Sequence, residues 1–168
     1  MRVEFWFDFN NESYETLKAF EMAYKDFYHK DKVDVFFRSL PKVEPNYIFH
    51  DCYQYGRRKK QGIKYLMEIF EIYQSNKNLL TSIDRLGKFF IDINELKADL
   101  LNQNCRKFVL NQLEHAELQK INETPTLAFT HGLRLSGKVT KEDILSTFIK
   151  MYEKDTGIKY CIEEDCER

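Results

Sequence analysis

Glycine and proline are scarce in this sequence of 168 residues, which contains 6 and 3 of them. An all-β fold needs many tight turns, and these two residues form a large share of such turns. The shortage therefore disfavours a β-sandwich or β-barrel and favours long helices. A chain of this length fits one domain and can bury enough surface to fold without disulfide bonds.

An excess of charge of one sign is also missing. The sequence has 26 Lys and Arg against 27 Asp and Glu, for a formal net charge of −1, and the two signs are interleaved. Such a balance gives no long-range field that would attract a nucleic acid, so we expect no nucleic-acid partner. One basic run, Arg57-Arg58-Lys59-Lys60, is interpreted as a solvated helix end or loop, with an anion site as the alternative.

No apolar run approaches the roughly 20 residues that a bilayer-spanning helix needs, and the first residues (MRVEFWF) predict a core strand rather than a signal peptide. We therefore predict a cytoplasmic protein without a membrane partner. Cytoplasmic thiols are kept reduced, so the four cysteines are expected to be free. Cys52 and Cys105 lie in helical context and are interpreted as packing residues. Cys161 and Cys166 have a spacing typical of neither a redox dithiol nor a zinc site.

A metal site is not predicted either. The four histidines, His29, His50, His115 and His131, are scattered along the chain without grouping as ligands. We interpret them as surface or capping residues.

The first forty residues predict a β-α-β unit. Residues 2–9 alternate as a strand does, and residues 10–13 (NNES) supply helix N-caps before a helical apolar pattern. Residues 32–40 are rich in β-branched and aromatic residues and end at Pro41, which is typical of a second strand. One helix between two strands implies a parallel pair.

A helical block is predicted from about residue 46 to 121. Asp92 is placed to cap one of its helices, and Thr81–Asp84 (TSID) resembles a capping box that opens another. Residues 47–55 (YIFHDCYQY) are denser in aromatic residues than one helix face requires. They either pack into the core or form an exposed partner surface.

The last third returns to sheet. Residues 125–129 and 133–136 flank a turn and predict a β-hairpin, and Thr140-x-x-Asp143 predicts a capping box on a final helix. The acidic residues 156–168 lack periodicity, so we expect a loosely held tail after a single domain of residues 1–155.

Three segments resemble the DsbA-like branch of the thioredoxin superfamily. Residues 4–9 (EFWFDF), followed by Tyr14, resemble the opening of its cytosolic members, where a strand ending in aspartate leads to Cys-Pro-x-Cys-Tyr. Residues 123–129 (ETPTLAF) resemble the segment whose cis proline faces the active site, and residues 131–137 (HGLRLSG) are similar to the hairpin that follows. The resemblance covers roughly residues 2–153 and implies an α/β thioredoxin-like fold, with βαβ and ββα halves separated by a DsbA-type helical subdomain.

The cysteine pair of that family is absent. Alignment on Tyr14 places Cys-Pro-x-Cys on Asn10, Asn11, Glu12 and Ser13, with a gap that leaves open which asparagine holds the first position. Dithiol exchange needs an attacking thiolate and a resolving sulfur, so no catalytic residue is predicted at this turn. The turn either caps the helix and does nothing more, or offers its free N–H groups to an anion or a peptide carbonyl.

These features predict a redox-inactive module that binds a peptide or protein partner or acts as an adaptor. Its expected groove is formed by Asn10, Asn11, Ser13, Tyr14, Thr124 and Pro125. The alternative is an enzyme, either a thiol-disulfide oxidoreductase or isomerase, or a glutathione-dependent enzyme similar to the kappa-class transferases. The Asp-Phe-x-Ser-Pro opening of those transferases would place its serine on Asn11. No cofactor is predicted, with glutathione as the candidate under this alternative.

Overall fold

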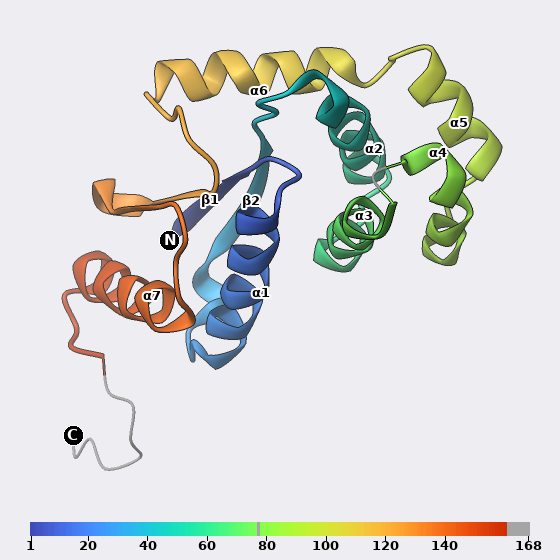
Figure 1. Cartoon of the computed structure of the whole chain (residues 1–168). Coiled ribbons are helices and arrows are strands. Elements are labelled where there is room, and N and C mark those ends of the chain that lie inside the picture. The colour runs from blue at the N-terminus through green and yellow to red at the C-terminus, as the bar shows by residue number, and fades with distance from the viewer. Residues whose placement is uncertain (77, 161–168) are drawn as a thin grey trace.

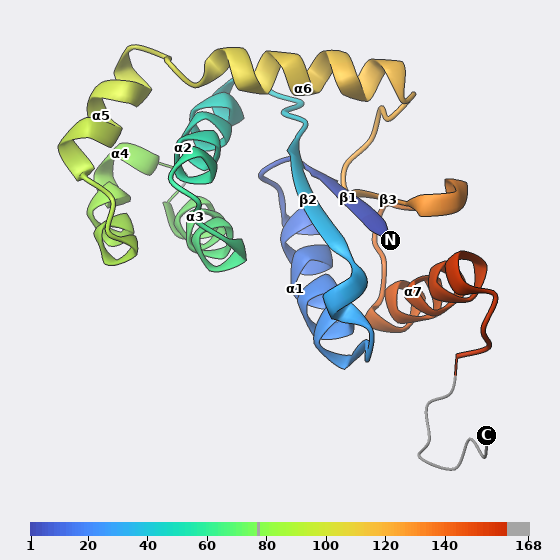
Figure 2. The ribbon, with the colours of Figure 1, turned by 180° about the vertical axis from the view of Figure 1, so that it is seen from behind.

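The computed structural model describes residues 1–76 and 78–160, and Figures 1 and 2 show it from two sides. Within these residues the strands form one sheet in the order β2-β1-β3-β4. The strands are β1 (Arg2–Phe7), β2 (Asp34–Ser39), β3 (Thr126–Phe129) and β4 (Arg134–Ser136). β1 runs parallel to β2 and antiparallel to β3, and β4 returns antiparallel to β3. The predicted β-α-β unit and β-hairpin are therefore both confirmed.

One face of the sheet is covered by α1 (Asn11–Asp26) and α7 (Lys141–Thr156), which lie side by side in Figure 1. Alternate residues of β1 point toward these helices and are fully buried. The ring of Phe5 contacts that of Phe20 in α1, with centroids 5.8 Å apart, and Phe129 of β3 contacts Phe148 of α7 at 5.5 Å. Aromatic side chains therefore form much of this half of the core, and burial of each contributes about 1.5–3 kcal/mol.

The chain between β2 and β3 is helical, as predicted for residues 46–121. Its helices are α2 (Tyr47–Arg58), α3 (Ile63–Asn76), α4 (Leu79–Ser82), α5 (Ile93–Leu101) and α6 (Arg106–Leu118). Figure 1 shows α2 to α5 gathered beside the sheet, while the long α6 leads back toward it. α6 covers the second face of the sheet, where Trp6 of β1 packs with Ala116 and Ile121.

The aromatic segment 47–55 belongs to the core. It forms most of α2, and every residue from Phe49 to Tyr55 is buried. The alternative of an exposed partner surface at this segment is therefore wrong.

Two of the predicted helix caps are confirmed and one is wrong. Asp92 accepts hydrogen bonds from the N–H groups of Asn94 and Glu95, and the Thr140–Asp143 capping box is present at the start of α7. The capping box predicted at Thr81 is wrong: Thr81 lies inside the short α4, where its hydroxyl donates to the carbonyl of Asn78.

Part of the predicted tail lies within the described residues. Gly157 ends α7 with a left-handed backbone at φ 70°, and Tyr160 stacks on Phe27 with ring centroids 5.5 Å apart. Residues 161–168, with Cys161 and Cys166, lie outside the described residues. In the part of the chain that the structure describes, no helix combines the length and apolar character needed to cross a membrane.

Candidate binding site

The start of α1 is capped by Asn10. The side-chain oxygen of Asn10 accepts a hydrogen bond from the N–H of Ser13 at 2.8 Å, and its backbone is extended as an N-cap requires. Such a cap stabilises a helix by about 1 kcal/mol. The same side chain reaches across to the loop before β3, where Nδ2 of Asn10 lies 3.4 Å from Oγ1 of Thr124. Asn10 therefore holds the capping position and also joins the two segments that were predicted to share a groove.

The loop that Asn10 contacts contains a cis peptide bond between Thr124 and Pro125. Pro125 is buried, its carbonyl accepts from the N–H of Gly137, and Thr124 is partly exposed. Within the described residues, the main-chain N–H and C=O of Thr124 take part in no hydrogen bond. These two groups are therefore available to an extended peptide.

The residues between Asn10 and Tyr14 have different environments. Asn11 and Glu12 are exposed, and with Glu15 and Lys138 they line a hollow of about 260 Å³. Tyr14 is partly exposed and stacks on Phe70 of α3, with centroids 5.6 Å apart.

Ser13 has no exposed surface, and its hydroxyl accepts the N–H of Asp8 at 3.4 Å. Ser13 therefore supports the turn from below and does not line the groove, contrary to the prediction. Its burial excludes direct contact with a ligand in this conformation.

A buried carboxylate lies directly beneath the turn. Asp8, only 2% exposed, accepts hydrogen bonds from the N–H groups of Phe9 and Lys42 at 2.8 and 3.1 Å. It also accepts from Nδ2 of Asn46 at 2.9 Å, and Nε2 of His50 lies 3.0 Å from the same oxygen. Asp8 thereby ties the end of β1 to α2 and to the loop that leads into it.

Asp8 is charged and His50 is neutral at neutral pH. Burial raises the pKa of Asp8, but the hydrogen bonds that its carboxylate accepts from His50, Asn46 and the N–H of Lys42 outweigh burial and hold the pKa below its ordinary value. Burial lowers the pKa of His50 by more than Asp8 raises it. The stable arrangement is a carboxylate that accepts Nε2–H from a neutral imidazole.

The prediction of a surface or capping role is wrong for His50, which is fully buried. Asn46, directly before α2, and His50 and Gln54 within it recur every four residues. They form one buried polar stripe that is visible in the sequence once that helix is known to be internal.

The described thiols are unsuited to redox chemistry in their present positions. Burial raises the pKa of Cys52 to about 12 and that of Cys105 to about 12, so both are protonated thiols at neutral pH. Sγ of Cys52 lies 3.3 Å from the hydroxyl of Tyr65 within the helical subdomain. Their prediction as buried, free thiols is confirmed. Among the described residues no group of three or more His, Cys, Asp or Glu is placed to hold a metal ion.

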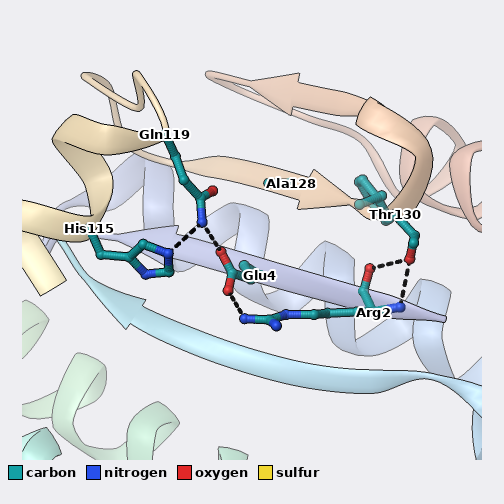
Figure 3. A pocket seen from close by; sticks show the side chains of 7 residues that line it. Arg2, Glu4, His115, Gln119, Ala128 and Thr130 are labelled. Carbon is teal, nitrogen blue, oxygen red and sulfur yellow. Dashed lines mark hydrogen bonds and ion pairs between the residues drawn. The ribbon is translucent and has the colours of Figure 1, made fainter.

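A second, polar hollow of about 250 Å³ lies on the α6 face of the sheet and is drawn in Figure 3. The carboxylate of Glu4 forms its floor and pairs with Arg2 and with Arg38, the latter at 2.8 Å. Nε2 of Gln119 donates to Glu4 at 3.1 Å and lies 2.8 Å from Nε2 of His115. Burial raises the pKa of Glu4, but these hydrogen bonds and charges outweigh it and lower the pKa overall. Glu4 is thus a satisfied, ionised carboxylate. No local sequence pattern indicates this network, because Arg38 and Gln119 lie 34 and 115 residues from Glu4.

Comparison with known proteins adds information at the level of fold. No family model matches the chain, and no curated protein matches it in sequence. Among solved structures, a probable DsbA oxidoreductase of Streptomyces coelicolor has a TM-score of 0.75 at 16% identity, over 96% of this chain and 94% of that one. BdbD of Bacillus subtilis, in its oxidised form, has a TM-score of 0.73 at 16% identity, over 90% and 87%. A thioredoxin-like oxidoreductase of Silicibacter pomeroyi has a TM-score of 0.69 at 15% identity, over 94% and 87%.

These likenesses extend over nearly the whole of each chain and include the helical subdomain as well as the sheet. The chain therefore has the thioredoxin-type α/β fold with an inserted helical subdomain that DsbA-like oxidoreductases have.

Proposed function

We propose that this protein is a redox-inactive relative of the DsbA-like oxidoreductases that binds an extended segment of a partner protein, in the manner of an adaptor. Its groove lies between residues 10–14 and the Thr124–Pro125 loop. The observation that carries the proposal is the chemistry at the start of α1, where the cap is the amide of Asn10 and the buried position three residues later is the hydroxyl of Ser13. Thiol-disulfide exchange needs a sulfur at such a position, and neither side chain has one.

Binding is supported by main-chain groups on both sides of the groove. Thr124 offers an N–H and a C=O for strand-type pairing. The N–H groups of Asn11 and Glu12, in the first turn of α1, point out of the N-terminal end of the helix. Neither group has a hydrogen-bond partner among the described residues. An extended peptide that pairs with Thr124 would bring its carbonyl groups toward these donors.

Redox inactivity is tested by an insulin-reduction assay of the full chain with dithiothreitol as the reductant. We expect insulin to precipitate no faster with the protein than without it. Catalysis that disappears when any one of the four cysteines is replaced by serine would identify an oxidoreductase and overturn the proposal.

Partner binding is tested by placing a photo-crosslinking amino acid at Asn11 and expressing the variant in the native cell. Asn11 is exposed and lines the hollow beside the groove. The matched control carries the same amino acid at Lys150, an exposed position on α7. We expect discrete cross-linked partners from position 11 that position 150 does not give. Identical patterns from the two positions would contradict a binding groove at the turn.

The glutathione-dependent form of the enzymatic alternative requires glutathione to bind the native state. A ligand present at ten times its Kd adds about 1.4 kcal/mol to the free energy of unfolding, which raises Tm by about 3–6 °C for a domain of this size. We expect no such rise with millimolar glutathione. A rise of that size, abolished by changes at Thr124, would favour the glutathione-dependent enzyme instead.

A further inference from the structure

The outer edge of β2 carries main-chain groups that nothing in the described chain satisfies. β2 is at the end of the sheet, and only β1 pairs with it. The N–H of Asp34 donates to the carbonyl of Met1, and the N–H of Leu40 donates to that of Phe7. The main-chain N–H and C=O groups of even-numbered residues in this strand therefore point toward β1. The main-chain N–H and C=O groups of the odd-numbered residues consequently point away from β1, toward the open edge; these residues are Val35, Phe37 and Ser39.

The helical subdomain covers only one end of this edge. The N–H of Ser39 donates to the side chain of Gln112, and the carbonyl of Phe37 accepts from the hydroxyl of Tyr53 at 3.1 Å. Within the described residues, the N–H and C=O of Val35 and the N–H of Phe37 have no hydrogen-bond partner. Three consecutive groups, alternating donor, acceptor and donor, are thus left along the free part of the edge.

Hollows border the free groups on both sides. One hollow of about 350 Å³ extends from β2 to α1, and a second of about 210 Å³ extends from β2 to the loop between α2 and α3. Both are lined by Val35, Phe37 and Ile63, so the two hollows adjoin along the strand, and together they are called the depression here. In Figure 2, β2 passes in front of α1, and the α2–α3 pair lies to one side of both.

The floor of the depression is apolar and part of its rim is basic. Val35 and Phe37 are partly exposed on the floor. Apolar residues on the free edge of a sheet favour pairing of that edge with a strand of another chain. Lys30 lies on the α1 side of the rim, and the exposed Arg57 lies on the other side, at the start of the basic run 57–60. The side chain of Arg57 forms no ion pair within the described residues.

We propose that the outer edge of β2 binds an extended peptide of a partner protein by strand addition, with apolar side chains at alternate positions and an acidic residue facing Arg57. The peptide supplies two acceptors and one donor to Val35 and Phe37 and places its apolar side chains in the depression. This site shares no residue with the groove at Asn10 and Pro125, so it is independent of the function proposed above.

An extended peptide fits this edge better than a second copy of the chain does. The free segment lies at the bottom of a depression with walls on both sides, which admits a single strand but obstructs a folded domain that carries the same walls. Two copies would also bring Lys30 and Arg57 of each rim toward the same charges of the other, whereas an acidic peptide complements them.

The test begins with a displayed library of random twelve-residue peptides, panned on the full chain. We expect enriched sequences to have apolar residues at positions i and i+2 with a nearby Asp or Glu. A synthetic peptide of the most enriched sequence should slow the amide hydrogen exchange of Val35 and Phe37, while the amides of Asp34 and Leu40, already bonded within the fold, should change little.

Two variants of the chain and one of the peptide complete the test. Arg57→Glu should weaken the peptide about tenfold, whereas the matched exposed change Lys150→Glu should have no effect. Methylation of the peptide nitrogen that donates to Val35 keeps all side chains and should abolish binding. Val35→Pro removes one outward N–H and should also weaken binding, provided that its circular dichroism matches the wild type.

Several results would overturn the proposal. These are enrichment of no alternating sequence, equal affinity of the methylated peptide, or unchanged exchange at Val35 and Phe37. A concentration-dependent dimer that Arg57→Glu alters would assign the edge to a second copy instead. Because Asn10→Ala should leave this peptide's affinity unchanged, failure here is distinguishable from failure of the groove at the turn.

Discussion

Two cysteines introduced at the start of α1 should create a reactive dithiol in this scaffold. Asn10→Cys places a sulfur at the partly exposed N-cap, and Ser13→Cys places one at a fully buried position one helical turn later. The first sulfur is reachable by a substrate and the second is shielded, which is the arrangement that an attacking and a resolving thiol need. Cys161→Ser and Cys166→Ser in the same chain would remove competing thiols.

The size of the expected pKa shift follows from the helix start. A charge at a helix N-terminus is stabilised by about 0.3–1 kcal/mol, and by up to about 2 kcal/mol where it is partly buried. One pKa unit corresponds to about 1.36 kcal/mol, so the thiol at position 10 should titrate at about 7–8 instead of about 8.5. The N–H of Ser13, which now donates to Asn10 at 2.8 Å, would remain available to the thiolate. The carboxylate of Glu12 in the first turn opposes the shift, so Glu12→Gln should lower this pKa further.

The pH dependence of alkylation by iodoacetamide measures this pKa, and insulin reduction measures the resulting activity. The matched control is Asn11→Cys, because position 11 is exposed in the first turn but does not cap the helix. The control thiol should titrate closer to the ordinary value and should show no insulin reduction. If the thiol at position 10 titrates at or above about 8.5, or if the pair does not oxidise to a disulfide, the assignment of this turn as a catalytic turn without its sulfurs is wrong.

Two further predictions concern stability. Gly56→Ala should lower the free energy of unfolding by about 1–3 kcal/mol, because the added Cβ would lie 2.0 Å from the ring of the buried Tyr65. The control Gly62→Ala, whose Cβ would have nothing within 4 Å, should change the free energy of unfolding little in urea titrations. Equal effects of the two variants would contradict the close packing of α2 on α3. Burial lowers the pKa of His50 despite Asp8. As the pH falls, His50 is therefore protonated in the unfolded chain at a higher pH than in the folded chain. Stability should then be lost below about pH 6.5, by up to about 1.4 kcal/mol per pH unit from this group, and His50→Gln should remove that part of the slope; an unchanged slope in the variant would show that His50 does not titrate as inferred.

Local signals in the sequence predicted the elements and their order well. The alternation over residues 2–9 predicted β1, the apolar spacing predicted the helices, and the Thr140–Asp143 pair predicted the start of α7. These signals depend on residues close in the chain, and so does the position of the turn at Asn10. The capping box at Thr81 was misleading because such a four-residue pattern is short enough to occur inside a helix by chance.

The sequence could not show which polar residues the fold would bury. His50 and Asp8 are forty-two residues apart, and Glu4 has distant partners in Arg38 of β2 and in Gln119, which follows α6. Nothing local distinguishes a buried histidine with a carboxylate partner from one on a surface, since the difference arises only when α2 packs against the end of β1. The same reasoning applies to Ser13, whose burial depends on the position of Asp8 beneath it.

The shape of the candidate groove and the thiol chemistry of DsbA-like oxidoreductases depend on different side chains. Asp8 joins the end of β1, the loop at Lys42 and the helix α2 through hydrogen bonds, none of which involves a side chain of residues 10–13. Asn10 then joins that assembly to the loop of Thr124 with an amide, a group that caps a helix about as well as any other side chain. Replacing a thiol by an amide at this position therefore removes the nucleophile while leaving the cap and the connection across the groove in place. A binding surface can consequently persist on this fold without its redox reaction, which is why the thiol and peptide experiments test separate parts of the proposal.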